Sequence, residues 1–262
     1  MSGPGSGSAR RPSLAELRAI AQPESTMSRR NAEHWLARLL LRRLSLPVTR
    51  ELLRTPVTAN QLTGLMIVIG LLAAGAAALP GLAWAIAAFV GVQLYFLLDL
   101  CDGEVARWRR STSVTGIYLD RVGHYLVEAA LLSAYGLRAG GQELGGWSTL
   151  GVAAGLFAVL VKAETDLVDV ARVRSGRAAA PDDAAVPRST ALGAMRRAAQ
   201  VLKVHQLTGA LESSFLLLVA AIVDAASDSL RGSEVLASVM FGIAATMTVL
   251  HLVSVLASRR LD

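Results

Sequence analysis

Residues 55–98 read TPVTANQLTGLMIVIGLLAAGAAALPGLAWAIAAFVGVQLYFLL, and this stretch contains no Asp, Glu, Lys or Arg. A helix needs about 20 apolar residues to cross the hydrocarbon core of a bilayer, so the stretch is long enough for two crossings. Leu79, Pro80 and Gly81 lie near its middle and predict the turn between them. The stretch therefore indicates a membrane protein with several spanning helices.

The composition of the whole chain supports this interpretation. Of its 262 residues, 53% are hydrophobic and only 18% are charged, and the mean hydropathy is +0.47. These values exclude an ordinary soluble domain. The net charge of +6 is expected to face anionic lipid headgroups rather than nucleic acid. Cys101 is the single cysteine, which excludes an intrachain disulfide.

We expect an all-α fold with six transmembrane helices. Further apolar segments follow the first two crossings, although the third and fifth crossings contain charged residues such as Asp120 and Glu212. The expected helices cover residues 60–79, 82–101, 114–136, 147–165, 208–225 and 235–257.

The part of the chain before residue 55 is expected to lie outside the membrane. Residues 1–26 are predicted to be a flexible cytoplasmic N-terminus. Residues 27–54 are predicted to form a juxtamembrane helix, because Leu and Trp residues recur at helical spacing against arginines, as in helices that lie in the bilayer interface. An ordinary amphipathic helix packed on protein is the alternative. The membrane domain then covers residues 55–262.

The distribution of basic residues predicts the orientation. Most of the 26 Lys and Arg residues precede residue 55, follow the second or fourth helix, or end the chain, whereas the opposite loops contain only Arg138 and Arg231. Cytoplasmic loops carry such an excess. Both termini are therefore expected in the cytoplasm, with the protein in the inner or plasma membrane of a bacterium.

Polar groups gather in residues 99–124, DLCDGEVARWRRSTSVTGIYLDRVGH, which we call the signature segment. Charges inside membrane helices are costly and are candidates for function. Asp99 and Asp102 are three residues apart, and Asp120 and His124 are four apart, so each pair shares one face of a helix. If the two helices are antiparallel neighbours, three carboxylates and an imidazole converge at the membrane edge.

Carboxylates held that close repel one another unless a cation lies between them. Hard oxygen ligands suit Mg²⁺ or Mn²⁺, and two such ions would bind and polarise a phosphate-containing substrate. We therefore expect two divalent ions, with Asp99, Asp102, Asp120 and His124 as ligands.

The signature segment resembles that of the CDP-alcohol phosphotransferase family. The match consists of Asp99, Asp102, Gly103, Ala106, Arg107, Gly116 and Asp120. The small residues in it would let a ligand approach the helix backbones closely. Thr55, Pro56, Asn60, Leu62 and Thr63 also resemble the opening of the family's first helix, and the resemblance covers roughly residues 27–258.

The resemblance implies an enzyme that transfers a substituted phosphoryl group from a CDP-alcohol to an acceptor alcohol and releases CMP. The donor is often CDP-diacylglycerol, which would place the reaction in phospholipid biosynthesis, and a soluble CDP-polyol is the alternative. The matched aspartates would hold the metals on the diphosphate. The nucleotide would be bound by Asn60, Thr63, Gly103, Ala106, Arg107 and Gly116. The family often dimerises, so a homodimer is one expected state of the protein.

His124 departs from the family, which has an Asp there that binds metal and is the proposed general base. An imidazole can also ligate a metal, and it is a competent base at neutral pH. We predict that His124 and Asp120 are catalytic and that Glu128, one turn further along, orients the imidazole. An inactive relative, or a pocket that His124 merely lines, is the alternative.

Lys162, at the end of the fourth expected helix, is a candidate for binding an anionic acceptor or phosphate. A terminal lysine can equally reach to the interface without a specific ligand. Two other functions compete with the transferase. A metal-binding transporter would use intramembrane carboxylates but does not explain the small residues of the signature segment, and an inactive scaffold would keep the fold alone.

Overall fold

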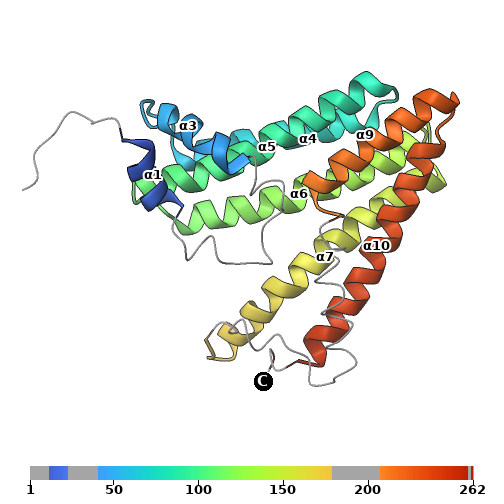
Figure 1. The fold of residues 1–262 in the computed structure, drawn as a ribbon. Coiled ribbons are helices and arrows are strands. Elements are labelled where there is room, and N and C mark those ends of the chain that lie inside the picture. Colours follow the sequence, from blue (N-terminus) through green and yellow to red (C-terminus); the bar gives the residue numbers. More distant parts are fainter. Residues whose placement is uncertain (1–11, 23–40, 179–206, 259–260, 262) are drawn as a thin grey trace, which may run out of the picture. The chain divides into compact units, whose positions relative to one another are not determined.

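The computed structural model describes residues 12–22, 41–178, 207–258 and 261. Within these ranges the regular structure is helical, and no strand occurs there (Figure 1). The helices are α1 (Leu14–Ala21), α3 (Arg42–Leu52), α4 (Ala59–Ala78), α5 (Leu82–Trp108), α6 (Val114–Ala139), α7 (Gly146–Arg174), α9 (Ala210–Ser227) and α10 (Arg231–Leu256). The expected all-α fold is confirmed.

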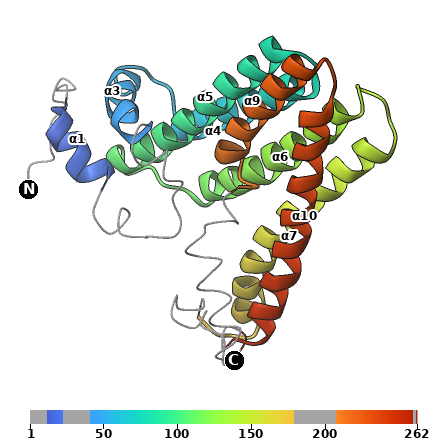
Figure 2. The same cartoon turned by 45° about the vertical axis from the view of Figure 1, so that its right-hand side comes forward.

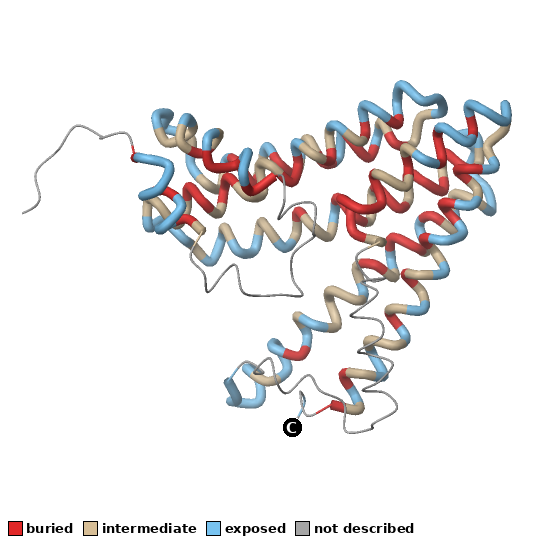
Figure 3. The backbone as a smooth tube through the Cα atoms, viewed as in Figure 1, coloured by how far each residue is buried: buried red, intermediate tan, exposed pale blue. Residues whose placement is uncertain are grey.

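Five of these helices, α4, α5, α7, α9 and α10, are long and apolar enough to cross a membrane. Many of their large apolar residues are exposed, for example Leu72 at 69% and Val219 at 58%. Figure 3 shows exposed positions in pale blue along these helices. So much exposed apolar surface suits lipid rather than water. The chain is thus an integral membrane protein with several spanning helices.

The expected third crossing corresponds to α6, which differs from the other five. It has 26 residues and is long enough to span, but it includes Asp120, Glu128 and Arg138. These charges lower its apolar content, and α6 is not among the five apolar candidates. A sixth crossing therefore stays a prediction.

The observed helix bounds extend several of the expected crossings, and two of them by more than a turn at the C-terminal end. The second and fourth were expected to end near residues 101 and 165, but α5 continues to Trp108 and α7 to Arg174. The expected ends followed the thickness of the bilayer, whereas a helix continues beyond it until its backbone hydrogen bonds stop. The extension of α5 matters because it carries Asp102, Gly103, Ala106 and Arg107 of the signature segment.

The N-terminal region contains a helix in a segment for which flexibility was predicted. Within residues 1–26, α1 begins with a capping box, in which Glu16 N donates to Ser13 Oγ and Ser13 N donates to Glu16 Oε2. Helix α3 lies within the expected juxtamembrane segment 27–54. The apolar positions before residue 41 lie outside the described residues.

The chain divides into two compact units. The first consists of residues 1–69 and 93–123, and the second of residues 70–92 and 124–262. Helices α4, α5 and α6 contribute to both, because the divisions fall inside them. In the second unit, α10 packs along α7 and also contacts α9 (Figure 2).

Glycines bring helices together within each unit. In the first, a Cβ added to Gly123 of α6 would lie 2.7 Å from Cγ1 of Ile67 in α4. In the second, a Cβ added to Gly151 of α7 would lie 2.8 Å from Cα of Gly136 in α6. Membrane helices pack closely where small residues meet, so these positions fix the helix contacts.

Arg138 was expected to be a loop charge, and this was wrong. It lies in the last turn of α6 and is fully buried. Its guanidinium donates to the carbonyls of Leu79 and Gly81 and to Ser233 Oγ, and its Nε lies 3.9 Å from Asp224 Oδ2. A buried arginine can satisfy exposed helix-end carbonyls, so Arg138 closes the turn between α4 and α5.

Replacement of Arg138 by Met should destabilise the second unit. The substitution leaves the buried Asp224 carboxylate without its cation and two carbonyls without their donor, which typically costs about 3–5 kcal/mol. We expect a clear fall in the thermal unfolding midpoint of the detergent-purified protein. The exposed Arg231→Met is the matched control. Equal midpoints for the two variants would contradict this role of Arg138.

Candidate active site

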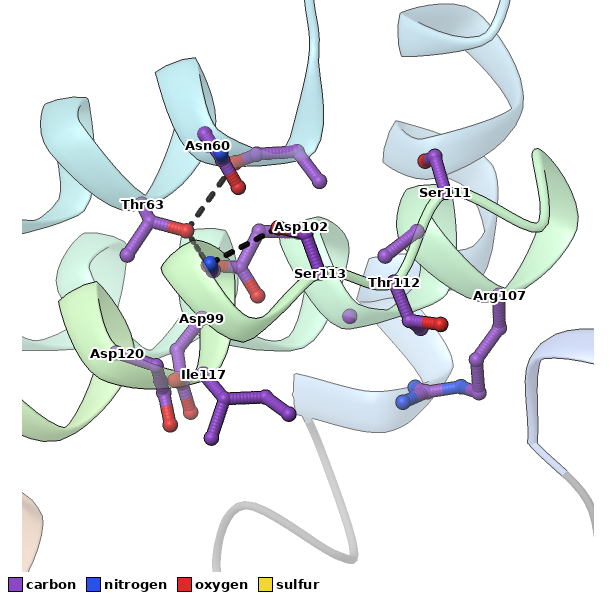
Figure 4. Close-up of a pocket in the computed structure, with 14 residues that line it drawn as sticks. Asn60, Thr63, Asp99, Asp102, Arg107, Ser111, Thr112, Ser113, Ile117 and Asp120 are labelled. Carbon is purple, nitrogen blue, oxygen red and sulfur yellow. Dashed lines mark hydrogen bonds between the residues drawn. The ribbon is translucent and has the colours of Figure 1, made fainter.

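A cavity of about 310 Å³ lies in the first compact unit (Figure 4). It is formed by the first turns of α4, the last turns of α5 and the beginning of α6. Its lining includes predicted site residues from all three helices: Asn60, Thr63, Asp99, Asp102, Gly103, Ala106, Arg107, Gly116 and Asp120. Ligand pockets start at roughly this size. The structure thus brings most of the predicted site together.

The α5 residues in this lining share one face of the helix. They are spaced at intervals of three and four residues, from Asp99 to Arg107, which is the repeat of a helix face. Because α5 continues to Trp108 as one helix, two carboxylates, two small residues and a guanidinium follow one another along the cavity wall. This regular arrangement requires the helical extension that the expected boundary omitted.

Asp102 is held by a hydroxyl from α4. Thr63 Oγ1 donates to Asp102 Oδ2, and both side chains are buried. The first turn of α4 is fixed by a reciprocal pair, in which Gln61 N donates to Thr58 Oγ1 and Thr58 N donates to Gln61 Oε1. The capped helix start therefore places Thr63 against the carboxylate.

Gly103 gives room to the guanidinium of Arg107. A Cβ added to Gly103 would lie 3.0 Å from Arg107 Nη1 and 3.3 Å from Nη2. The arginine thus lies back along its own helix, over the glycine one turn earlier, and its Nη edge borders the cavity. A larger side chain at position 103 would displace the cation from this wall.

Gly116 gives room to the side-chain amide of Asn60. A Cβ added to Gly116 would lie 2.9 Å from Asn60 Oδ1 and 3.2 Å from Ser113 Oγ. Gly116 N also donates to Ser113 Oγ, which caps the start of α6. The glycine therefore lets the α4 amide lie directly against the first turn of α6.

Three potential ligand atoms for a cation come together beside the cavity. Asp99 and Asp120 lie side by side in Figure 4, and α6 continues without interruption to His124, one turn after Asp120. One carboxylate oxygen from each aspartate and one imidazole nitrogen lie within 4.8 Å of one another. Two hard oxygens and a nitrogen at this separation fit a divalent ion such as Mg²⁺ or Mn²⁺.

Two predicted residues pair with each other in the second unit. Lys162 Nζ lies 2.6 Å from Glu128 Oε1, and the Glu128 side chain is 7% exposed. The lysine thus brings its charge to a buried carboxylate. Neither residue lines the cavity described above.

Sequence reasoning missed the part that Arg109 plays in the site. Its guanidinium donates to the carbonyls of Val57 and Thr55. This fixes the turn that leads into α4 and its site residues. No sequence signal distinguishes such an arginine from its neighbour Arg110, because the acceptors are backbone atoms.

The sequence could have identified Ser113 as the residue that caps the start of α6. It stands directly before α6, at the position where Ser, Thr, Asp and Asn cap helices.

The sequence profile of the CDP-alcohol phosphatidyltransferase family matches residues 56–225. This is well over half of the chain and includes the whole signature segment. The chain belongs to this family. The comparison with curated proteins gave no match. Membership supports a transferase that uses a CDP-linked donor and an alcohol acceptor, and the family's metal dependence agrees with the Asp99, Asp120 and His124 cluster.

Gly116→Ala should impair the transferase activity of this family member. The new methyl group would push Asn60 away from α6, so we expect CMP release to fall about ten-fold, a loss of about 1.4 kcal/mol in transition-state binding. Gly64→Ala is the matched control, because a Cβ there meets nothing within 4 Å and alanine favours a helix. Similar rates for the two variants would show that the Gly116 contact is unimportant.

Proposed function

We propose that the protein transfers a phosphatidyl group from CDP-diacylglycerol to a small alcohol and releases CMP. The observation that carries the proposal is the cavity lined by the signature residues, with Asp99, Asp120 and His124 gathered beside it. It combines a candidate cation site with a guanidinium, as binding of a diphosphate requires.

Exposed apolar side chains favour a lipid donor. Val114, Ile117 and Tyr118 on the first turns of α6 are 85%, 64% and 65% exposed, and Ile117 also lines the cavity. Acyl chains attached to a donor in the cavity would find apolar surface there, whereas a soluble CDP-polyol would gain nothing from it. We place this face at the cytoplasmic side of the membrane, in accord with the distribution of arginines.

In the proposed reaction, the acceptor hydroxyl attacks the phosphorus that carries the diacylglycerol group. A new bond forms between the acceptor oxygen and this phosphorus, and the bond from phosphorus to the bridging oxygen breaks. CMP leaves with the bridging oxygen and the electron pair. The proton of the acceptor passes to the imidazole of His124, which then releases it to water.

The other residues bind and orient the donor. Asn60, Thr63, Gly103, Ala106 and Gly116 border the nucleotide, and the small residues allow it to lie against the helix backbones. The Nη edge of Arg107 binds the diphosphate.

Asp99, Asp102, Asp120 and His124 would hold two divalent ions. When bound, Mg²⁺ or Mn²⁺ neutralises diphosphate charge and polarises the phosphorus–oxygen bonds. A neutral imidazole has one free lone pair, so His124 would ligate an ion only before the transfer step. During that step it accepts the proton, and the three aspartates alone would hold the ions.

For the acceptor, we propose an alcohol that carries an anionic group. The Lys162 side chain is 32% exposed, so an anion can reach the ammonium although it pairs with Glu128. Inositol phosphate, glycerol phosphate and serine meet this requirement, and another polyol without a charge provides the comparison. Glu128 would also orient His124, one turn earlier on α6.

The purified protein should release CMP from CDP-diacylglycerol when Mg²⁺ or Mn²⁺ and one of these acceptors are present. Incubation with each acceptor, followed by mass spectrometry of the lipid products, identifies the alcohol. Chelation of the metal, or Asp120→Asn, should abolish release. Turnover of a soluble CDP-polyol but not of CDP-diacylglycerol would refute the lipid donor, and full release by Asp120→Asn would refute the proposed site.

Substitutions at His124 test its part in proton transfer. General base catalysis typically contributes 10²–10⁴-fold, so we expect His124→Ala to lower kcat by roughly 100-fold or more. His124→Asp should retain substantial activity, since a carboxylate can accept a proton and bind metal. His251→Ala, which removes a histidine paired with Glu164, serves as the control. If the wild-type protein is inactive and His124→Asp makes it active, the wild-type protein is instead an inactive scaffold.

A further inference from the structure

Helix α1 lies before the region that matches the family, yet it is anchored to the first compact unit. Leu17 and Ala21 on α1 are fully buried against Leu46 of α3, and Leu53 and Trp108 pack on this cluster. The family match begins only at residue 56. The helix lies outside the matched region, so the match does not explain its contacts.

A buried carboxylate at the end of α5 joins three helices. Glu104 is 1% exposed, and its oxygens accept hydrogen bonds from Gln22 Nε2 at 2.7 Å, Ser45 Oγ at 2.6 Å and Thr49 Oγ1 at 2.6 Å. The donors come from the C-terminal end of α1 and from α3. A buried carboxylate requires such partners, so these bonds fix the end of α1 on the signature part of α5.

The same end of α1 holds Arg107. Arg107 Nε donates to the carbonyl of Ala21 at 2.6 Å, and the helix C-terminus there favours a nearby cation. The Nη edge lies over Gly103 and borders the cavity. One edge of the guanidinium is thus fixed by α1, while the other faces the space where a diphosphate would lie.

We propose that α1 is a positioning element for Arg107, with Leu17 and Gln22 as its positioning residues. Docking of α1 sets the plane of the guanidinium before the donor arrives. An arginine binds two phosphate oxygens in parallel only when its planar fork has the correct orientation. Without α1, the long side chain loses that orientation and must be ordered when the nucleotide binds. This inference rests on the proposed function, because it requires the cavity to bind the CDP part of the donor.

Binding of CDP to the full-length protein in Mg²⁺-containing detergent solution tests this inference. Leu17→Asn should undock α1 and raise the Kd for CDP about three- to ten-fold, the effect expected when one long side chain loses its order. Ile20→Asn is the matched control, because Ile20 lies on the same helix and is 51% exposed. It should bind CDP as the wild type does. Gln22→Ala removes one anchor without a change in the apolar cluster and should give a smaller rise in Kd.

A double-mutant cycle separates positioning from general stability. In an Arg107→Ala background, Leu17→Asn should cause no further loss of CDP affinity, since the group that α1 orients is absent. The same loss in both backgrounds, or CDP binding by Leu17→Asn and Gln22→Ala equal to wild type, would overturn the inference while the proposed function stands. A wild-type protein that does not bind CDP would overturn the proposed function, and the inference with it.

Discussion

Repulsion between the carboxylates of Asp99 and Asp120 is the constraint around which the site is built. Two carboxylates and an imidazole place ligand atoms within 4.8 Å of one another, beside a cavity that is formed in part by the apolar helices α4 and α5. Such a cluster is costly unless a cation offsets its charge. Neighbouring contacts fix the helices that carry these groups: Thr63 of α4 holds Asp102 of α5, and capped starts fix α4 and α6.

Small residues leave the space that the site side chains and helices need to lie close together. Gly116 allows Asn60 to lie on α6, Gly103 allows Arg107 to fold along α5, and Gly123 allows α6 to contact Ile67. Each of these contacts lies within the first compact unit. The glycines of the signature segment therefore define the shape of the cavity, while its aspartates and arginine define its charge.

The sequence predicts the helical membrane fold and the cavity lining for clear physical reasons. Long uncharged runs must form helices in lipid, and the three- and four-residue spacings from Asp99 onward place polar groups on one helix face. What escaped prediction depends on backbone acceptors and on distant partners. Arg138 and Arg109 bind carbonyl groups, and Glu104 is satisfied by Gln22, far away in the sequence. Periodicity and composition contain no information about such pairings, although the Ser13 and Glu16 capping box could have revealed α1.

Anomalous scattering from Mn²⁺ in crystals grown with CDP can show whether the site binds divalent cations on the CDP diphosphate. We expect an anomalous peak within about 2.0–2.3 Å of carboxylate oxygens of Asp99 and Asp120, next to the diphosphate. An ordered nucleotide elsewhere, or strong Mn²⁺ peaks only away from these two aspartates, would contradict it.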